Sequence, residues 1–71
     1  MTQARIIDEN ADFYAEMDPA RPPVGSIPVG EVVETGKVRR RMGRSWVTVT
    51  RQGGQAGYIL GDTHIFPLRN V

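Results

Sequence analysis

The chain has 71 residues, a net charge of +1 and no cysteine. This length allows one domain with a small core and leaves little room for a deep pocket holding a catalytic constellation. The absence of cysteine excludes disulfides and thiolate metal sites, so packing must stabilise the fold. We expect a single domain over 1–71, in which 1–10 form a peripheral first strand or a flexible end.

The first residues contain no apolar run of the length that a signal peptide needs, and they soon become acidic. No segment approaches the roughly 20 apolar residues of a membrane span. These features predict a cytoplasmic protein that does not contact membranes. A domain cut from a larger protein would have the same pattern.

Charge is divided unevenly along the chain. Residues 1–35 hold seven acidic residues and two arginines, a net charge of −5, whereas residues 36–71 hold seven basic residues and one acidic residue, a net charge of +6. This polarity could serve self-association, because the basic part of one copy would attract the acidic part of another.

Eight glycines and five prolines interrupt the sequence every few residues, so the segments between them must be short strands or loops. Those segments are rich in valine, isoleucine, threonine and aromatic residues, as strands are. We predict a strand or a single helical turn over 12–17, a loop with local extended structure over 18–30, strands over 4–7, 31–38, 45–51, 56–60 and 65–68, and turns over 39–44, 52–55 and 61–64.

The strand around Trp46 shows the clearest alternation. Val47 and Val49 share one face, which we expect to join the core, and Trp46 lies on the other. Beyond a turn with paired glycines, Ile59 is expected on the valine face and Tyr58 on the tryptophan face. About five short antiparallel strands in so short a chain predict an all-β fold, and barrel closure would remove the exposed edges.

Two segments resemble the bacterial Src-homology-3-like (SH3-like) domains. Residues 24–33, VGSIPVGEVV, are similar to the family's opening motif of hydrophobic-Pro-x-Gly-x-x-Val. Residues 46–49 and 57–59 are similar to its W-x-x-V and G-Y-I hairpin. The likeness covers about residues 11–60. It implies a small SH3-like barrel of the SH3b type that acts as a non-catalytic module for protein interaction or cell-wall targeting.

The relatives that bind proline-rich peptides have a second tryptophan and a proline after the G-Y-I segment. Here Val47 and Leu60 stand at those positions. Aromatic-lined grooves are what hold an extended proline helix. The sequence therefore does not predict a site for proline-rich peptides.

The sharpest functional signal is the basic run over 37–44, which places five cations within eight residues. Arginines at a hairpin tip could bind phosphates, and Trp46 and Tyr58 could stack on bases. The same residues could instead contact an acidic protein surface, or form a solvated turn that keeps a sheet edge soluble.

His64 is the only histidine, and no second histidine or cysteine completes a metal site with it and Asp62. We expect it to be a turn residue that hydrogen-bonds to the backbone. The acidic residues near the start lack the spacing of a calcium loop. No Ser/His/Asp set, phosphate loop or dinucleotide fingerprint is present. We predict no catalytic residue, metal, cofactor or small-molecule substrate.

The leading hypothesis is a protein-interaction or scaffolding module that binds a protein partner or a second copy of itself. The alternative is a small nucleic-acid-binding barrel that uses the basic turn for phosphate contacts. A third possibility is an enzyme built from several copies around one pore, but the Trp46 strand offers it no acid or base. The contact residues predicted for the leading hypothesis lie on one aromatic face and one basic turn: Tyr14, Arg39, Arg40, Arg41, Arg44, Trp46 and Tyr58.

Overall fold

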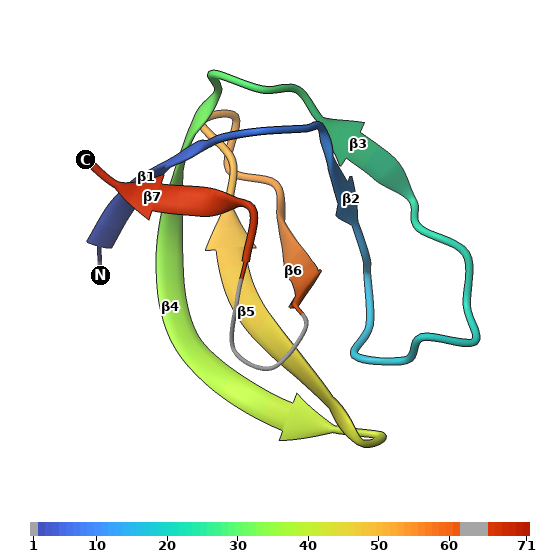
Figure 1. The fold of residues 1–71 in the computed structure, drawn as a ribbon. Coiled ribbons are helices and arrows are strands. Elements are labelled where there is room, and N and C mark those ends of the chain that lie inside the picture. The colour runs from blue at the N-terminus through green and yellow to red at the C-terminus, as the bar shows by residue number, and fades with distance from the viewer. Residues whose placement is uncertain (1, 62–65) are drawn as a thin grey trace.

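The computed structural model describes residues 2–61 and 66–71, and within them it contains strands and no helix (Figure 1). The all-β prediction is therefore confirmed. No described residue belongs to a helix that is long and apolar enough to cross a membrane. The seven strands are β1 (Thr2–Ile6), β2 (Ala11–Phe13), β3 (Gly25–Ile27), β4 (Val32–Arg41), β5 (Arg44–Thr50), β6 (Ala56–Gly61) and β7 (Leu68–Asn70).

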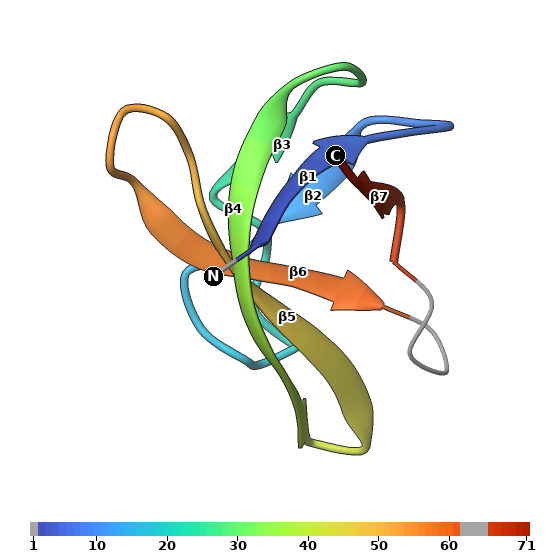
Figure 2. The ribbon, with the colours of Figure 1, turned by 90° about the vertical axis from the view of Figure 1, so that its left-hand side faces the viewer.

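Five strands form one antiparallel sheet in the order β6-β5-β4-β1-β7, and β2 and β3 form a separate two-stranded sheet. β4 is long and strongly bent, so the sheet curves around the interior (Figures 1 and 2). Along the described residues the ladder does not close into a barrel, because β6 and β7 remain its two ends. The small sheet is joined to β6 at one point, a bridge between Tyr14 and Tyr58 with two backbone hydrogen bonds of 2.8 Å.

The core lies between the curved sheet and the two-stranded sheet. Val47, Val49 and Ile59 are buried in it, as the alternation of β5 predicts. Phe13 and Ile27 enter from the small sheet, so the two sheets share one hydrophobic interior. The full cluster of buried side chains comprises Ile6, Ala11, Phe13, Ile27, Val33, Val47, Val49 and Ile59.

Gly57 allows the two sheets to approach closely. A Cβ atom at this position would lie 2.6 Å from Cζ of Phe13 and 2.6 Å from the carbonyl oxygen of Tyr14. Real Cβ atoms do not approach other heavy atoms this closely, so only glycine fits without displacing its neighbours. The glycine of the G-Y-I segment therefore has a packing role.

A bidentate ion pair connects the start of β4 to the turn between β5 and β6. Nε of Arg51 lies 2.7 Å from one carboxylate oxygen of Glu31, and Nη2 lies 2.8 Å from the other. These hydrogen bonds hold the pKa of the Glu31 carboxyl below its ordinary value of 4.5. The paired geometry is the one in which arginine binds carboxylates most specifically.

Several boundaries differ from the sequence prediction. Of the two alternatives predicted for 12–17, the strand is present, over residues 11–13, and it is shorter than predicted. β3 lies in the segment over 18–30, the predicted loop with local extended structure. The last strand begins at Leu68, three residues after the predicted start. Most of the predicted turn over 61–64, including Asp62 and His64, lies outside the described residues.

Candidate functional site

The β4–β5 hairpin ends in a two-residue turn, Met42–Gly43. Both residues have positive φ, 55° at Met42 and 72° at Gly43. This is the pattern of a type I′ turn, whose twist matches that of the strands it connects. The predicted basic turn over 39–44 is therefore mostly strand, since β4 continues to Arg41 and β5 begins at Arg44.

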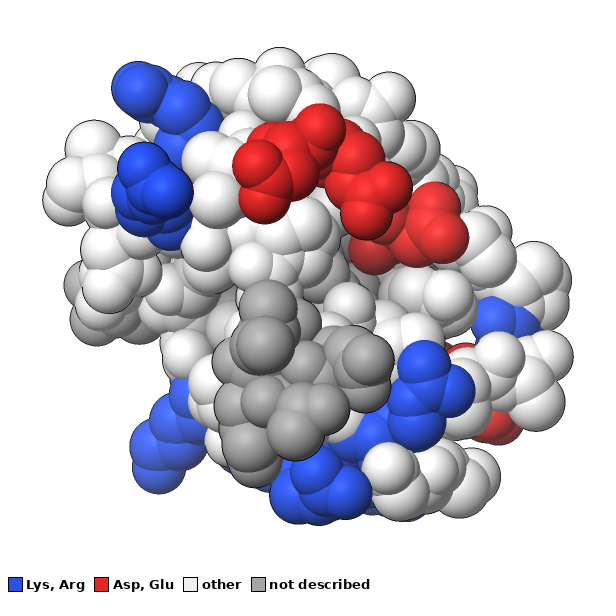
Figure 3. Space-filling view, in the orientation of Figure 1, with Lys and Arg blue, Asp and Glu red and all other residues white. Residues whose placement is uncertain are grey.

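Five of the nine basic residues lie on this hairpin, and all five are exposed. Among residues 2–61 and 66–71, the salt bridges are Glu16–Arg21 and Glu31–Arg51, so no described carboxylate forms a salt bridge with the hairpin. Glu16 and Asp18 border a hollow that Arg41 also lines. The space-filling view shows several basic residues along the lower end of this face and a band of acidic residues across its upper part, with further basic residues at the upper left (Figure 3). The cations of the hairpin, called the basic hairpin below, are Lys37, Arg39, Arg40, Arg41 and Arg44.

Arg40 differs from its neighbours because it is tied to the hairpin itself. Its Nη1 donates to Oγ of Ser45 and its Nη2 donates to the carbonyl oxygen of Gly43, both at 3.2 Å. Arg39 lies opposite Trp46 in the ladder, so it points to the other face of the hairpin. The basic hairpin therefore presents cations on both of its faces.

Trp46 does not lie on the surface, in contrast to its predicted place in a contact patch. Its side chain is 0% exposed. The edge of its ring meets the Tyr14 ring at a centroid distance of 5.4 Å, and its indole N–H donates to the carbonyl oxygen of Arg41 at 3.0 Å. The sheet face opposite the valines is thus covered here by the segment that follows β2. Trp46 positions the basic hairpin and is not available to stack on a partner.

Tyr14 and Tyr58 are half-buried, and each borders a hollow. The hollow at Tyr58 is lined in part by the basic hairpin, whereas the described lining of the hollow at Tyr14 comes from residues 14–24. The hollow next to Tyr58 has a volume of about 330 Å³ and also contains Met17, Arg41 and Met42. Its apolar side chains come from segments far apart in the sequence. The structure therefore places Tyr58 and Arg41 around one hollow, together with two methionines that are not among the predicted contact residues.

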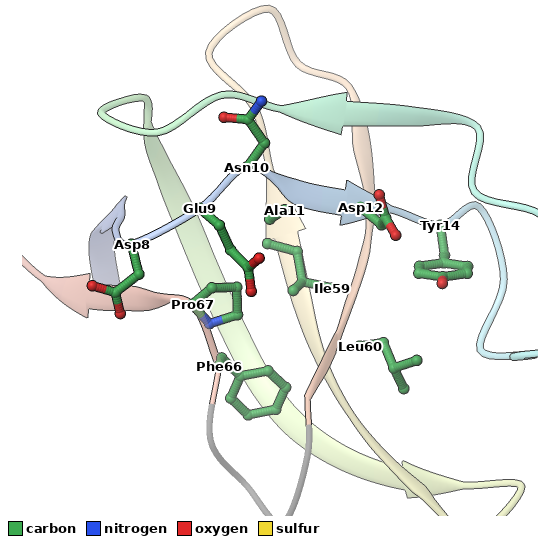
Figure 4. Close-up of a pocket in the computed structure, with 10 residues that line it drawn as sticks. All are labelled: Asp8, Glu9, Asn10, Ala11, Asp12, Tyr14, Ile59, Leu60, Phe66 and Pro67. Atoms are coloured by element: carbon green, nitrogen blue, oxygen red, sulfur yellow. The ribbon is translucent and has the colours of Figure 1, made fainter.

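A second hollow of about 440 Å³ lies at the opposite end of the small sheet (Figure 4). Asp8, Glu9 and Asp12 project around it, and Ile59 and Phe66 supply apolar lining. Within the described part of the chain, no group of three or more His, Cys, Asp or Glu residues could hold a metal ion. The acidic residues are therefore spread along a rim and do not converge on one point.

Comparisons of the chain with protein-family models, curated proteins and solved structures find no match. The SH3-like resemblance therefore stays a prediction that depends on the motifs around Trp46 and Tyr58. The side chains of the basic hairpin and their surroundings are the basis for a functional proposal.

Proposed function

We propose that the chain is a non-catalytic protein-interaction module of the SH3-like type, and that it binds an acidic segment of a partner protein through the basic hairpin. One observation carries the proposal. Five cations project on a hairpin that extends beyond the core, and no carboxylate among the described residues pairs with them. Guanidinium groups bind carboxylates in bidentate geometry, so such a surface selects acidic partners.

Met42 supports the same assignment. It is 62% exposed at the tip of the hairpin, and its positive φ is a conformation that asparagine and glycine adopt more readily. A strained and exposed apolar residue is a reason to suspect a contact role. Methionine and arginine are both enriched in protein interfaces. Together they form a surface with an apolar tip and charged flanks.

Nucleic acid is the alternative partner, and burial of Trp46 weighs against it. Binding of single strands usually combines basic residues with exposed aromatic rings on which bases stack. With Trp46 buried, the other aromatic side chains that the structure describes near the basic hairpin are the half-buried Tyr14 and Tyr58. A second copy of the chain, offering the acidic rim of Asp8, Glu9 and Asp12, would be one acidic protein partner among others.

The test is an NMR titration of the ¹⁵N-labelled chain with an N-acetylated ten-residue peptide of alternating glutamate and threonine. We expect the amide resonances of 38–44 to shift, and we expect the double variant Arg39→Glu/Arg41→Glu to lose binding. The matched control is Arg5→Glu/Arg69→Glu, which changes the net charge equally on the paired strands β1 and β7.

Three results would contradict the proposal. They are hairpin resonances that do not move with the peptide, equal loss of binding in the control variant, and tighter binding of a ten-residue oligothymidylate than of the peptide. Binding to the oligonucleotide alone, weakening steeply with salt, would support the nucleic-acid alternative.

A further inference from the structure

The outer part of β4 has a neighbour on only one side. β1 pairs with β4 from Val32 to Thr35, whereas β4 continues to Arg41. Along residues 36–41, β5 lies on one side and no described strand lies on the other (Figure 2). The basic hairpin therefore contains an open sheet edge, which is the kind of edge that can accept another strand.

The register shows which backbone groups face this edge. The two-residue turn closes on the pair Arg41–Arg44, so Arg41 and, two residues earlier, Arg39 direct their backbone groups to β5. The residues that alternate with them, Val38 and Arg40, direct their N–H and C=O groups outward. The register of the β4–β5 ladder shifts between Thr35 and Val38, and this irregularity changes which residues of β4 face β5 and which face outward.

Side chains at the edge combine charge with one apolar contact. Arg39 and Arg41 lie on one face of β4, and Val38 lies on the other with 48% of its surface exposed. Arg40 is held against Ser45 and Gly43 on the Val38 face. An incoming strand would meet on one face two cations that form no salt bridge with a described residue, and on the other face an exposed valine.

We propose that the acidic partner segment binds in extended form, as an additional strand along β4 beside Val38 and Arg40. The inference deepens the proposed function and rests on it. Backbone hydrogen bonds to Val38 and Arg40 would supply affinity, and carboxylates at alternate positions of the segment would pair with Arg39 and Arg41.

Charge decides which strand fits. Two copies pairing edge to edge would place arginines opposite arginines, and like charges directly across a ladder are destabilising. Charged edge strands keep proteins from aggregating for this reason. The same cations attract an acidic strand. The open edge therefore disfavours pairing with β4 of a second copy and favours pairing with an acidic segment.

The experiment uses the glutamate–threonine peptide and measures amide hydrogen exchange of the wild-type chain with and without it. We expect exchange at Val38 and Arg40 to slow at least tenfold, because both amides would become donors to the added strand. Exchange at Arg39 and Arg41, whose amides already face β5, is expected to change by less than about twofold. A peptide with N-methyl groups at alternate residues tests the same bonds from the partner's side.

The variant Val38→Pro removes the outward donor without breaking a bond to β5, and Val38→Ala is its matched control. We expect the proline to weaken peptide binding about tenfold and the alanine by about twofold or less. If Arg39–Arg44 resonances shift but Val38 and Arg40 exchange as before, strand addition is wrong and the proposed function stands. If the peptide does not bind, both fail. Dimers that form without peptide and that persist in the Arg39→Glu/Arg41→Glu variant, with exchange at Val38 and Arg40 slowed, would show that the edge pairs with its own copy and would also overturn the inference.

Discussion

The indole N–H of Trp46 donates a hydrogen bond of 3.0 Å to the main-chain carbonyl oxygen of Arg41. The bond links a completely buried ring to the last residue of β4, whose own side chain is exposed. The Tyr14 ring packs edge-on against the same indole. The orientation of the basic hairpin therefore depends on interior packing as well as on its turn.

Replacing Trp46 by phenylalanine should destabilise the fold by about 2 to 3 kcal/mol, because it removes this hydrogen bond and leaves space beside Tyr14. The measurement is chemical denaturation of variant and wild type. Arg41→Ala is the control, since it keeps the carbonyl oxygen and should change the stability by less than about 0.5 kcal/mol. Equal stability of the Trp46 variant and the wild type would show that the indole contributes little.

Gly57→Ala should destabilise the fold by about 3 kcal/mol or more, because its methyl group would overlap Phe13 and the Tyr14 carbonyl oxygen. Thermal unfolding measures the change. The control is Gly53→Ala in the β5–β6 turn, where an added Cβ would meet nothing within 4 Å. If both variants unfold at the same temperature, the two sheets do not meet at Gly57 as described.

The Glu31–Arg51 pair gives the stability a defined pH dependence. The Glu31 pKa is lowered in the folded state, mainly by hydrogen bonds from Arg51, so the unfolded state binds the proton more readily. The contribution of Glu31 is complete above its unfolded value of 4.5 and declines as the pH falls through the lowered folded value. Glu31→Gln should be less stable than wild type at pH 7, and the two should converge in denaturation measured towards pH 2. A constant difference across that range would contradict the assignment.

Met42→Asn should raise the stability and weaken partner binding. Asparagine adopts positive φ more readily than methionine, so the gain should be about 0.5 to 1 kcal/mol in chemical denaturation. Loss of the exposed apolar tip should weaken binding of the glutamate–threonine peptide. Met42→Leu is the control, because it keeps an apolar side chain in the same unfavourable conformation. If both variants bind the peptide with unchanged affinity, Met42 is not part of the contact surface.

The parts of the fold that sequence reasoning predicted are those set by local pattern. The alternation around Val47 and Val49 predicts their burial, and the glycines after Arg51 predict a turn. β3 was not predicted as a strand, because three prolines lie close to it and its pairing depends on residues of β2 more than ten positions away. The extension of β4 to Arg41 was not predicted either, because Met42–Gly43 is not a usual sequence for a two-residue turn.

The candidate site was predicted in its charges and not in its aromatic part. Exposed arginines follow directly from the composition of 37–44. Burial of Trp46 does not, because β5 only places it opposite the valines, and the side chain that packs edge-on against it, Tyr14, comes from a distant segment. An open sheet edge is equally invisible in a sequence, since it depends on where β1 stops pairing with β4.

The pairing of β1 with β7 has a consequence for how the molecule forms. Arg5 lies opposite Arg69 in the ladder, so the first strand gains its second neighbour only from residues near the other end of the chain. Joining such distant segments lowers the conformational entropy of the chain, and this loss occurs before the stabilising contacts between the segments have formed. We expect slow folding for so small a domain, on the scale of milliseconds to seconds. During synthesis, the sheet would remain incomplete until β7 had emerged from the ribosome.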